Sequence, residues 1–245
     1  RGGGPGRSGP GCWGCGGGVV GENSTLTLST SVYISGSGPL PGVAKQVGTG
    51  AVRSHKRVGL GLAAGWIREE FELNGQDWEN RGKRLNEMIR ALRELWKPGW
   101  VEWHGAYYDI PSMMLGPSPT APIPIYSGGH TDAALRRAAR YCDGWIGNAY
   151  PWDEAAQYVA QLKKFRKEYG RESEPFEIFV GFYEPPTVEL YRRASEELGV
   201  TSTYCLPWAA LDASSEGRHD GMLSSAARYR DSIFRFADEI VLKLK

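Results

Sequence analysis

A short stretch in the middle of the chain has the residue types needed to bind an anion. Gly128 and Gly129 come directly after an apolar run, Ile123–Tyr126, that is typical of a short buried parallel strand. Residues 130–132 (His-Thr-Asp) follow with side chains that can cap the alanine-rich helix predicted next. A glycine pair between a strand and a helix lets backbone N–H groups approach an anion, and the helix dipole favours negative charge there. The pattern therefore indicates a phosphate-binding turn.

The same residues also have a simpler explanation. The glycines can serve only to relieve backbone strain in a tight strand-to-helix turn. Two glycines are a weak signal, so the residues by themselves leave both explanations open. His130 is the one histidine at this turn, and we expect it to cap the helix. The other histidines, at positions 55, 104 and 219, have no carboxylate at an informative spacing, so no catalytic acid or base is identified.

The cysteines do not indicate a metal or redox site. Cys12 and Cys15 form a Cys-x-x-Cys pair, but no second pair or histidine pair stands at ligand spacing. A thioredoxin-like motif would need a strand before it and a helix after it, and neither is predicted. We therefore expect no metal site.

Composition excludes several classes of protein. The chain has 245 residues, a hydrophobic share of 41% and nine tryptophans, which is enough for a sizeable core. Its net charge of +1 gives no reason to expect a nucleic acid or an anionic membrane as partner. No apolar run reaches the length of a membrane span, and no signal peptide is apparent. We expect a cytoplasmic protein.

The glycine-rich beginning of the chain differs from the rest. Residues 1–22 contain too little apolar surface to offset the entropy lost on ordering, so we expect this segment to be disordered. Residues 23–245 form the predicted folded domain.

Strands and helices alternate through this domain. The Glu79–Trp96 helix has the clearest periodicity, with Leu85, Met88 and Leu92 on one face, and a small β-hairpin is predicted at Trp100–Ile110. An acidic loop is expected at 69–72. The predicted strands are Thr25–Ile34, Arg57–Ala64, Ile123–Tyr126, one around Trp145 that ends before Asn148, Phe176–Tyr183 and Thr201–Leu206. The other predicted helices are Val43–Val52, one from Asp132, Asp153–Tyr169, one from Thr187 to Leu198 and one from about Ser224, with Ile233, Phe236, Ile240 and Leu244 among the inward residues of the last.

This alternation predicts an α/β fold with a parallel sheet and right-handed crossovers. A closed eight-stranded β/α barrel and an open doubly wound sheet are both compatible with it. Six predicted strands are fewer than a complete barrel contains.

Several segments, in order, resemble the luciferase-like monooxygenase family, especially its branch that uses the deazaflavin coenzyme F420. Each segment is moderately specific, and the resemblance rests on their combination. They are AKQVGT (Ala44–Thr49), KRVGLGLAAGWIREEF (Lys56–Phe71), RGKRLNEMIRALRELW (Arg81–Trp96), PIPIYSGGHTDAALRRAARYCDGWIG (Pro122–Gly147) and RDSIFRFADEIV (Arg230–Val241).

The resemblance implies a (β/α)8 TIM-barrel type of fold with a flavin or deazaflavin over the carboxyl ends of the strands. The six predicted strands match the third to eighth strands of the family. We therefore expect an incomplete barrel that lacks the first two βα units, with the glycine-rich tract in their place. A truncated or misassembled chain would explain this pattern.

The resemblance also implies which residues bind the cofactor. It assigns the cofactor phosphate to Gly128, Gly129 and Thr131, with Arg136 or Arg137 as candidates to screen its charge, although a solvated helix face explains these arginines better. It matches Ser31–Val32 to a position where the family often has a non-prolyl cis peptide bond, with an ordinary strand end as the alternative. It places Gly61, Ala63 and Asn148 near the cofactor. The family usually has glycine where this chain has Ala63, so the match there is imperfect. We expect Trp66 to be a buried core residue rather than one that flanks the ring or substrate. Glu70 matches a common acidic residue of the family, with a solvated loop charge or helix cap as the equal alternative.

The implied activity is that of an oxidoreductase or monooxygenase that acts on a small-molecule substrate. The expected cofactor is coenzyme F420, with FMN as the alternative, as in an alkanal-type monooxygenase. A catalytically inactive barrel that binds cofactor weakly or not at all is the alternative from another class, and an unrelated phosphate-ester binder is a third. A homodimer is compatible with the resemblance.

Overall fold

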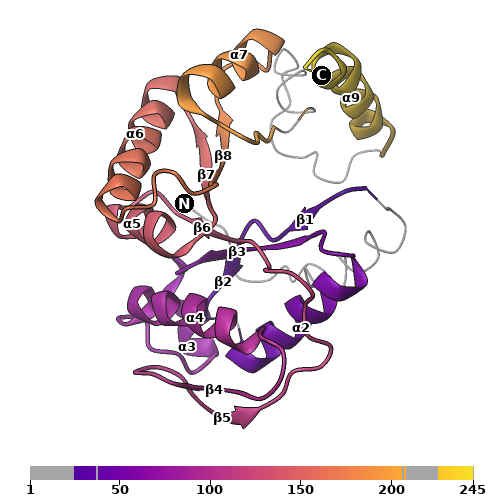
Figure 1. The fold of residues 1–245 in the computed structure, drawn as a ribbon. Helices are drawn as coiled ribbons and strands as arrows, with labels where there is room; N and C mark the ends of the chain where they lie inside the picture. Colours follow the sequence, from indigo (N-terminus) through magenta and orange to yellow (C-terminus); the bar gives the residue numbers. More distant parts are fainter. Residues whose placement is uncertain (1–24, 37, 206, 208–225, 245) are drawn as a thin grey trace. The chain divides into compact units, whose positions relative to one another are not determined.

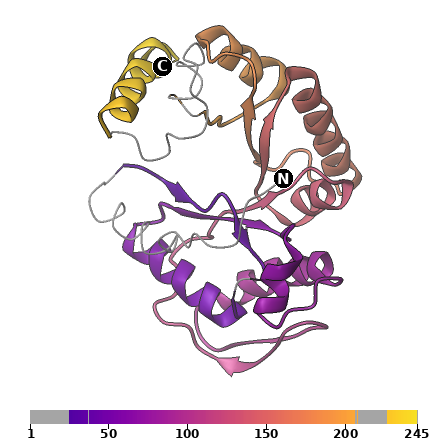
Figure 2. The ribbon, with the colours of Figure 1, turned by 180° about the vertical axis from the view of Figure 1, so that it is seen from behind.

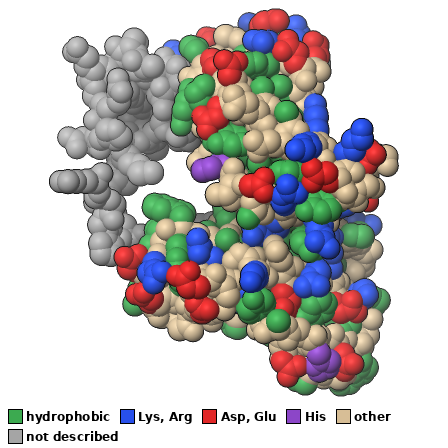
Figure 3. All heavy atoms as spheres, turned by 90° about the vertical axis from the view of Figure 1, so that its left-hand side faces the viewer, with side chains coloured by type: hydrophobic (Ala, Val, Ile, Leu, Met, Phe, Trp, Pro, Cys, Tyr) green, Lys and Arg blue, Asp and Glu red, His purple; other side chains and the backbone are tan. Residues whose placement is uncertain are grey.

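The computed structural model describes residues 25–36, 38–205, 207 and 226–244, so the segment expected to be disordered lies outside the described residues. The described residues divide into two compact units, an N-terminal unit that ends at Gly128 and a C-terminal unit that begins at Gly129. In the described ranges no helix is long and apolar enough to cross a bilayer. Acidic and basic side chains are interspersed over the face shown in Figure 3.

The N-terminal unit is built on parallel strands covered by helices (Figure 1). Strand β3 lies between β1 and β2 on one side and β6 on the other, and all these pairs are parallel. An antiparallel hairpin of β4 and β5 follows α4, as predicted. The elements are β1 (Leu28–Ser29), β2 (Tyr33–Ile34), α2 (Leu40–Arg53), β3 (Val58–Ala63), α3 (Arg68–Leu73), α4 (Arg81–Leu95), β4 (Val101–His104), β5 (Asp109–Met113) and β6 (Ile125–Gly128).

Alternation along the strands gives this sheet two different faces. Leu60, Leu62 and Ile125 lie on one face and are fully buried. Helices α2 and α4 pack on this side, and Figure 2 shows the same arrangement from behind. On the other face, β3 and the end of β6 carry small residues, and the candidate functional site is on this face. The inward face predicted for the long helix is confirmed, because Leu85, Met88, Ile89, Leu92 and Leu95 have no exposed surface.

Two predictions for this unit are wrong. The single strand expected at Thr25–Ile34 is two short strands, β1 and β2. Residues 30–32 lie between them outside the regular ladder, and Thr30 bonds to β3 through its side-chain hydroxyl. The acidic loop expected at 69–72 is the helix α3, whose buried Phe71 attaches it to the core. Its acidic residues favour the first turn of a helix as much as a loop.

The C-terminal unit is also a parallel α/β arrangement. Strands β7 and β8 pair in parallel, and α5 and α6 pack on one face around the buried Trp145, Leu162 and Val180. Helix α7 continues directly into a π-helical turn, η1. The elements are α5 (Asp132–Tyr141), β7 (Gly144–Tyr150), α6 (Trp152–Glu168), β8 (Glu177–Phe182), α7 (Val188–Arg193), η1 (Ala194–Leu198), α9 (Ala226–Glu239) and η2 (Val241–Lys243).

A strand and a helix cap predicted for this unit need correction. The strand expected at Thr201–Leu206 is reduced, in its described residues, to one bridge between Phe179 and Ser202. Asp153 does not cap α6, which starts at Trp152 after Pro151, and the backbone N–H of Trp152 donates instead to Glu184 at 2.8 Å.

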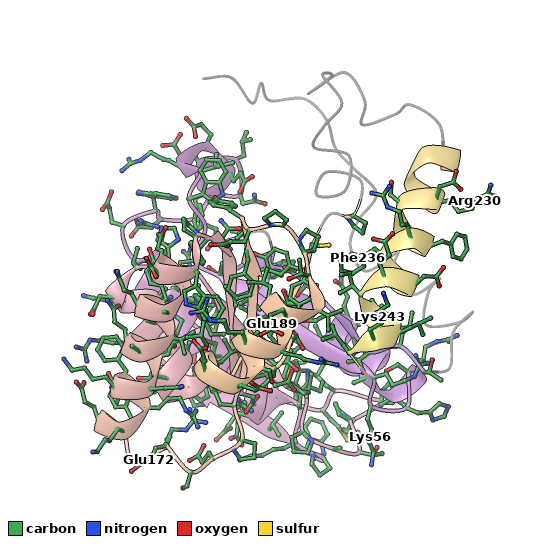
Figure 4. The ribbon with its side chains drawn as sticks, turned by 90° about the horizontal axis from the view of Figure 1, so that it is seen from above. Lys56, Glu172, Glu189, Arg230, Phe236 and Lys243 are labelled. Carbon is green, nitrogen blue, oxygen red and sulfur yellow. The ribbon has the colours of Figure 1, made fainter. Side chains whose placement is uncertain are left out.

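The last helix packs through fewer residues than predicted. Phe236 meets Tyr191 of α7 edge to face at 6.4 Å, and Ile240 is buried. In Figure 4, Phe236 lies on the side of α9 that faces α7, whereas Arg230 projects outward. Ile233 and Leu244, which were expected to be inward, are 47% and 38% exposed.

Candidate functional site

Small side chains meet closely at the carboxyl ends of the strands in the N-terminal unit. A Cβ atom added at Gly128 would lie 3.0 Å from Cγ1 of Val32 and 3.5 Å from Cβ of Ala63. Gly128 thus packs closely against Val32 and Ala63. It is the last residue of β6, whereas the sequence analysis predicted it in the turn that follows the strand. These three residues, Val32, Ala63 and Gly128, form what we call the small-residue wall.

The segment before β2 is held against β3. The hydroxyl of Thr30 donates to the carbonyl of Gly61 at 2.7 Å, and the N–H of Ser35 donates to the carbonyl of Ala63 at 3.0 Å. The Ser31–Val32 peptide bond is cis, so the conformation implied by the resemblance is confirmed. These bonds place Val32 of the wall relative to β3.

A buried aromatic ring supports the loops that follow β2 and β3. Cβ atoms added at Gly36 or Gly65 would each lie 2.6 Å from the ring of Phe71, and Gly65 has a φ of +89°. Only glycine fits both the backbone conformation and the space at Gly65. Trp66, the next residue, is 83% exposed, so the expectation of a buried core tryptophan is wrong. Glu70 is exposed in the first turn of α3 and is neither a loop residue nor the helix cap, so both of these expected roles are wrong.

The C-terminal unit begins with the turn that joins Gly129 to α5. Gly129 has a φ of +108°, and a Cβ atom there would lie 3.1 Å from Cβ of Ala134. The carbonyl of Gly129 accepts a hydrogen bond of 2.7 Å from Nε1 of Trp145. The hydroxyl of Thr131 accepts from the N–H of Ala134 at 3.3 Å and so caps the helix. The Trp145 bond and the Thr131 cap therefore hold the turn in place. The first N–H groups of α5 lie at an exposed helix start, a place that suits an anion.

Aromatic side chains surround the base of this turn. His130 does not cap the helix, because Thr131 does. Its ring lies against Tyr150 and Tyr158, with Nδ1 of His130 3.4 Å from the hydroxyl of Tyr150. Burial raises the pKa of Tyr150, and a hydrogen bond to Glu154 raises the pKa of Tyr158 to about 12. Both phenols therefore stay protonated at neutral pH.

Two arginines of α5 have different surroundings. Arg136 pairs with Asp132 at 2.8 Å and with Glu168 at 2.9 Å, so its charge is compensated on the helix surface. Arg137 is only 5% exposed, so the solvated face expected for it is wrong.

Asn148 lies inside a strand rather than after its end. The sequence placed Asn148 just past the strand, but it lies within β7, where the register shifts between Ile146 and Ala149. Its side chain is exposed. Within the described ranges, no group of three or more His, Cys, Asp or Glu side chains could hold a metal ion.

The comparisons with known proteins identify the family. The model of the luciferase-like monooxygenase family matches residues 15–184. The chain belongs to the luciferase-like monooxygenase family.

Relatives in this family use two different cofactors. An uncharacterized protein of Mycobacterium tuberculosis is 45% identical over 65% of this chain and 54% of its own length. An F420-dependent glucose-6-phosphate dehydrogenase of Amycolatopsis mediterranei is 28% identical over 81% of this chain and 57% of its own length. An FMNH2-dependent dimethylsulfone monooxygenase of Pseudomonas fluorescens is 32% identical over 43% of this chain and 30% of its own length. The chain thus spans about half the length of the curated relatives it matches.

Solved structures confirm the fold class. The coenzyme F420-dependent tetrahydromethanopterin reductase of Methanopyrus kandleri has a TM-score of 0.62 at 17% identity, over 69% of this chain and 53% of that one. The monooxygenase RslO1 of Streptomyces bottropensis has a TM-score of 0.62 at 15% identity, over 92% of this chain and 71% of that one. This luciferase-like protein therefore has the α/β fold of the TIM-barrel type that the sequence predicted, and it matches part of the barrel.

Sequence reasoning missed the residues that hold the turn and the wall in place. The Trp145 bond to Gly129 joins positions 16 residues apart and has no local pattern. Two charged residues of α4, Arg84 and Glu87, are also buried. Their positions one and two residues from the inward Leu85 place them at the borders of the apolar face, which is the signal that could have revealed them.

Proposed function

We propose that this luciferase-like protein is an oxidoreductase that binds a reduced deazaflavin, coenzyme F420, and acts on a small-molecule substrate. Membership of the family supports the class of enzyme. The F420-dependent dehydrogenase covers more of this chain than the FMNH2-dependent monooxygenase does, which favours the deazaflavin. FMN is the alternative cofactor, because a relative that uses it is also similar.

The observation that carries the proposal is the turn at Gly129. Its positive φ, its carbonyl held by Trp145 and the cap at Thr131 present backbone N–H groups at an exposed helix start. This is the arrangement that a cofactor phosphate needs, since backbone donors and the helix dipole act together there. We assign the phosphate to this turn. Gly128, which precedes it, would contribute by its lack of a side chain.

The small-residue wall fits the planar ring of such a cofactor. Val32, Ala63 and Gly128 present no long side chain, and a Cβ atom at Gly128 would lie only 3.0 Å from Cγ1 of Val32. Ser31, Val32, Gly61 and Ala63 would bind the ring, and Asn148 would bind the cofactor from β7. When bound, a deazaflavin would supply hydride transfer, whereas a flavin would also activate oxygen. The protein's residues would bind and orient it.

Titration with both cofactors tests the proposal. Purified protein would be titrated with F420 and with FMN, and binding would be followed by quenching of tryptophan fluorescence and by the shift in thermal midpoint. We expect a micromolar or lower dissociation constant for F420 and weaker binding of FMN. The reverse order would favour an FMN-dependent monooxygenase. No binding of either cofactor would favour the inactive alternative.

A further inference from the structure

A buried arginine of α4 has hydrogen-bond donors that are not used. Arg84 is 5% exposed, and its Nε and Nη2 atoms are buried without a hydrogen-bond partner among the described residues. The centre of its guanidinium lies 5.7 Å from the ring of Phe71, which provides only a cation–π contact. A guanidinium stays charged at any pH at which proteins fold, and a buried charge without a partner is costly.

The nearest carboxylate on the same helix is already occupied. Glu87 accepts hydrogen bonds from the N–H groups of Ala106, Tyr107 and Tyr108 at 2.9–3.1 Å and from Nε1 of Trp103 at 3.2 Å. Among the described residues no hydrogen bond or ion pair joins it to Arg84. The hydrogen bonds to Glu87 come from the hairpin, and the Nε and Nη2 donors of Arg84 stay unused.

The position of Arg84 points to a ligand. The Phe71 ring that it faces packs against Gly36 and Gly65, the residues that follow β2 and β3. Arg84 is thus close to the carboxyl ends of parallel strands, the edge at which α/β proteins bind their ligands.

Two buried acceptors on segments that adjoin Arg84 in sequence or the Phe71 ring in space are also unsatisfied. Oδ1 of Asn80 and Oγ of Ser35 are buried without a partner among the described residues. Asn80 precedes Arg84 by four residues, so the two lie on the same side of the helix region. Ser35 precedes Gly36, which contacts the same Phe71 ring. Donors and acceptors together suit an oxyanion that carries or adjoins a hydroxyl group.

We propose that Arg84 binds an oxyanion of the substrate, a carboxylate or a phosphate. The fork of N–H groups on a guanidinium matches two oxygens of such a group. The proposal rests on the proposed function, because it assumes that the substrate binds at this edge of the N-terminal unit. It adds that the substrate is anionic.

Thermal unfolding of three proteins tests this inference. Wild type, Arg84→Met and Arg81→Met would be melted in a chloride buffer of fixed ionic strength, with inorganic phosphate or acetate replacing chloride. Arg81 is the matched control, because its guanidinium stacks on Trp78 at 3.7 Å and donates to the Trp78 carbonyl. We expect phosphate or acetate to raise the midpoint of wild type and of Arg81→Met by a few degrees, and to leave Arg84→Met unchanged.

The chloride midpoints give a second readout. We expect Arg84→Met to melt at the same temperature as wild type or higher, because it removes an uncompensated buried charge. A lower midpoint for Arg84→Met, with no anion effect on wild type, would show that the protein itself satisfies Arg84 and would overturn the inference. An anion effect of equal size in Arg84→Met and wild type would also overturn it.

These outcomes are distinguishable from failure of the proposed function. Cofactor binding without an Arg84-dependent anion effect overturns only the anion site. An Arg84-dependent anion effect without cofactor binding supports the anion site and overturns the proposed oxidoreductase.

Discussion

At the scale of single residues, Glu87 joins two separate parts of the N-terminal unit, helix α4 and the hairpin of β4 and β5. Glu87 is a buried residue of α4, and the turn between β4 and β5 donates to its carboxylate from the backbone N–H groups of three consecutive residues. Burial by itself raises the pKa of Glu87, but the hydrogen bonds from Trp103 and the turn together outweigh it, so the pKa lies below the usual value of a glutamate. The hairpin is therefore held by a charged group rather than by apolar contacts alone.

Replacing Glu87 with Gln should destabilise the protein. The substitution removes the charge and points an amide N–H group at backbone donors, so we expect the free energy of unfolding to fall by about 2–4 kcal/mol. Urea denaturation followed by circular dichroism measures this. Glu94→Gln is the control, since Glu94 pairs with Lys97 at the surface and should cost less than about 1 kcal/mol. Equal losses in the two variants would contradict the role assigned to Glu87.

The same carboxylate gives a pH dependence of definite sign. Because its pKa is lower in the folded state than in the unfolded one, its stabilisation is complete above about pH 4.5 and is lost as the pH falls through the folded-state value. The stability gap between wild type and Glu87→Gln should therefore narrow in acid. A gap that stayed constant from pH 7 to pH 3 would contradict this.

Sequence alone could predict little at this scale. The glycines at 128 and 129 and the Thr131 cap were visible because turn and cap residues act locally. The burial of Arg84 and Glu87 has only a weak signal in their positions at the border of the apolar face, because the sequence does not show that the hairpin covers Glu87 or that Phe71 lies by Arg84. The exposure of Trp66 depends on Phe71 filling the space beneath the loop, which the sequence does not show.

At the scale of elements, two threonine caps offer a matched comparison. Thr131 caps α5 and Thr187 caps α7, each by accepting a bond from the N–H three residues later, at 3.3 and 3.0 Å. Either threonine replaced by alanine should lower the free energy of unfolding by about 1 kcal/mol.

Only one of the two variants should change cofactor binding. Thr131 stands at the turn that we assign to the phosphate, so Thr131→Ala should weaken F420 binding several-fold, whereas Thr187→Ala should not. Fluorescence titration of both variants measures the difference. Loss of affinity in both, or in neither, would argue that the α5 start does not hold the cofactor.

Elements with a strong local pattern were the ones that could be predicted. The long helix α4 was predicted because its apolar spacing spans four turns, and the helix that begins after Thr187 was predicted at its observed start. At α5 the sequence offered several capping residues together, and Thr131 rather than the expected His130 is the cap. The Thr25–Ile34 segment has strand composition throughout, but the Thr30 side chain bonds across to Gly61 and interrupts the ladder. The segment after Thr201 has a similar composition and pairs at a single bridge, because strand pairing depends on a neighbour and not on composition.

At the scale of the whole molecule, family and fold follow from the order of the segments rather than from any one of them. Each unit is a parallel α/β arrangement, and the family model spans both. This chain spans 54% and 57% of the length of two of these relatives, and binding measurements test the activity, substrate and cofactor proposed for it.

The central claim is that the turn at Gly129 holds the phosphate of the cofactor. The most direct test is the dissociation constant of F420 for Gly129→Ala and Gly170→Ala. Both glycines have positive φ. Gly170 follows the end of α6, and a Cβ atom there would meet no atom within 4 Å. We predict that Gly129→Ala binds F420 at least about ten-fold more weakly, a change of about 1.4 kcal/mol, while Gly170→Ala binds it like wild type. Equal affinity of both variants, with circular dichroism showing that both are folded, would contradict the claim.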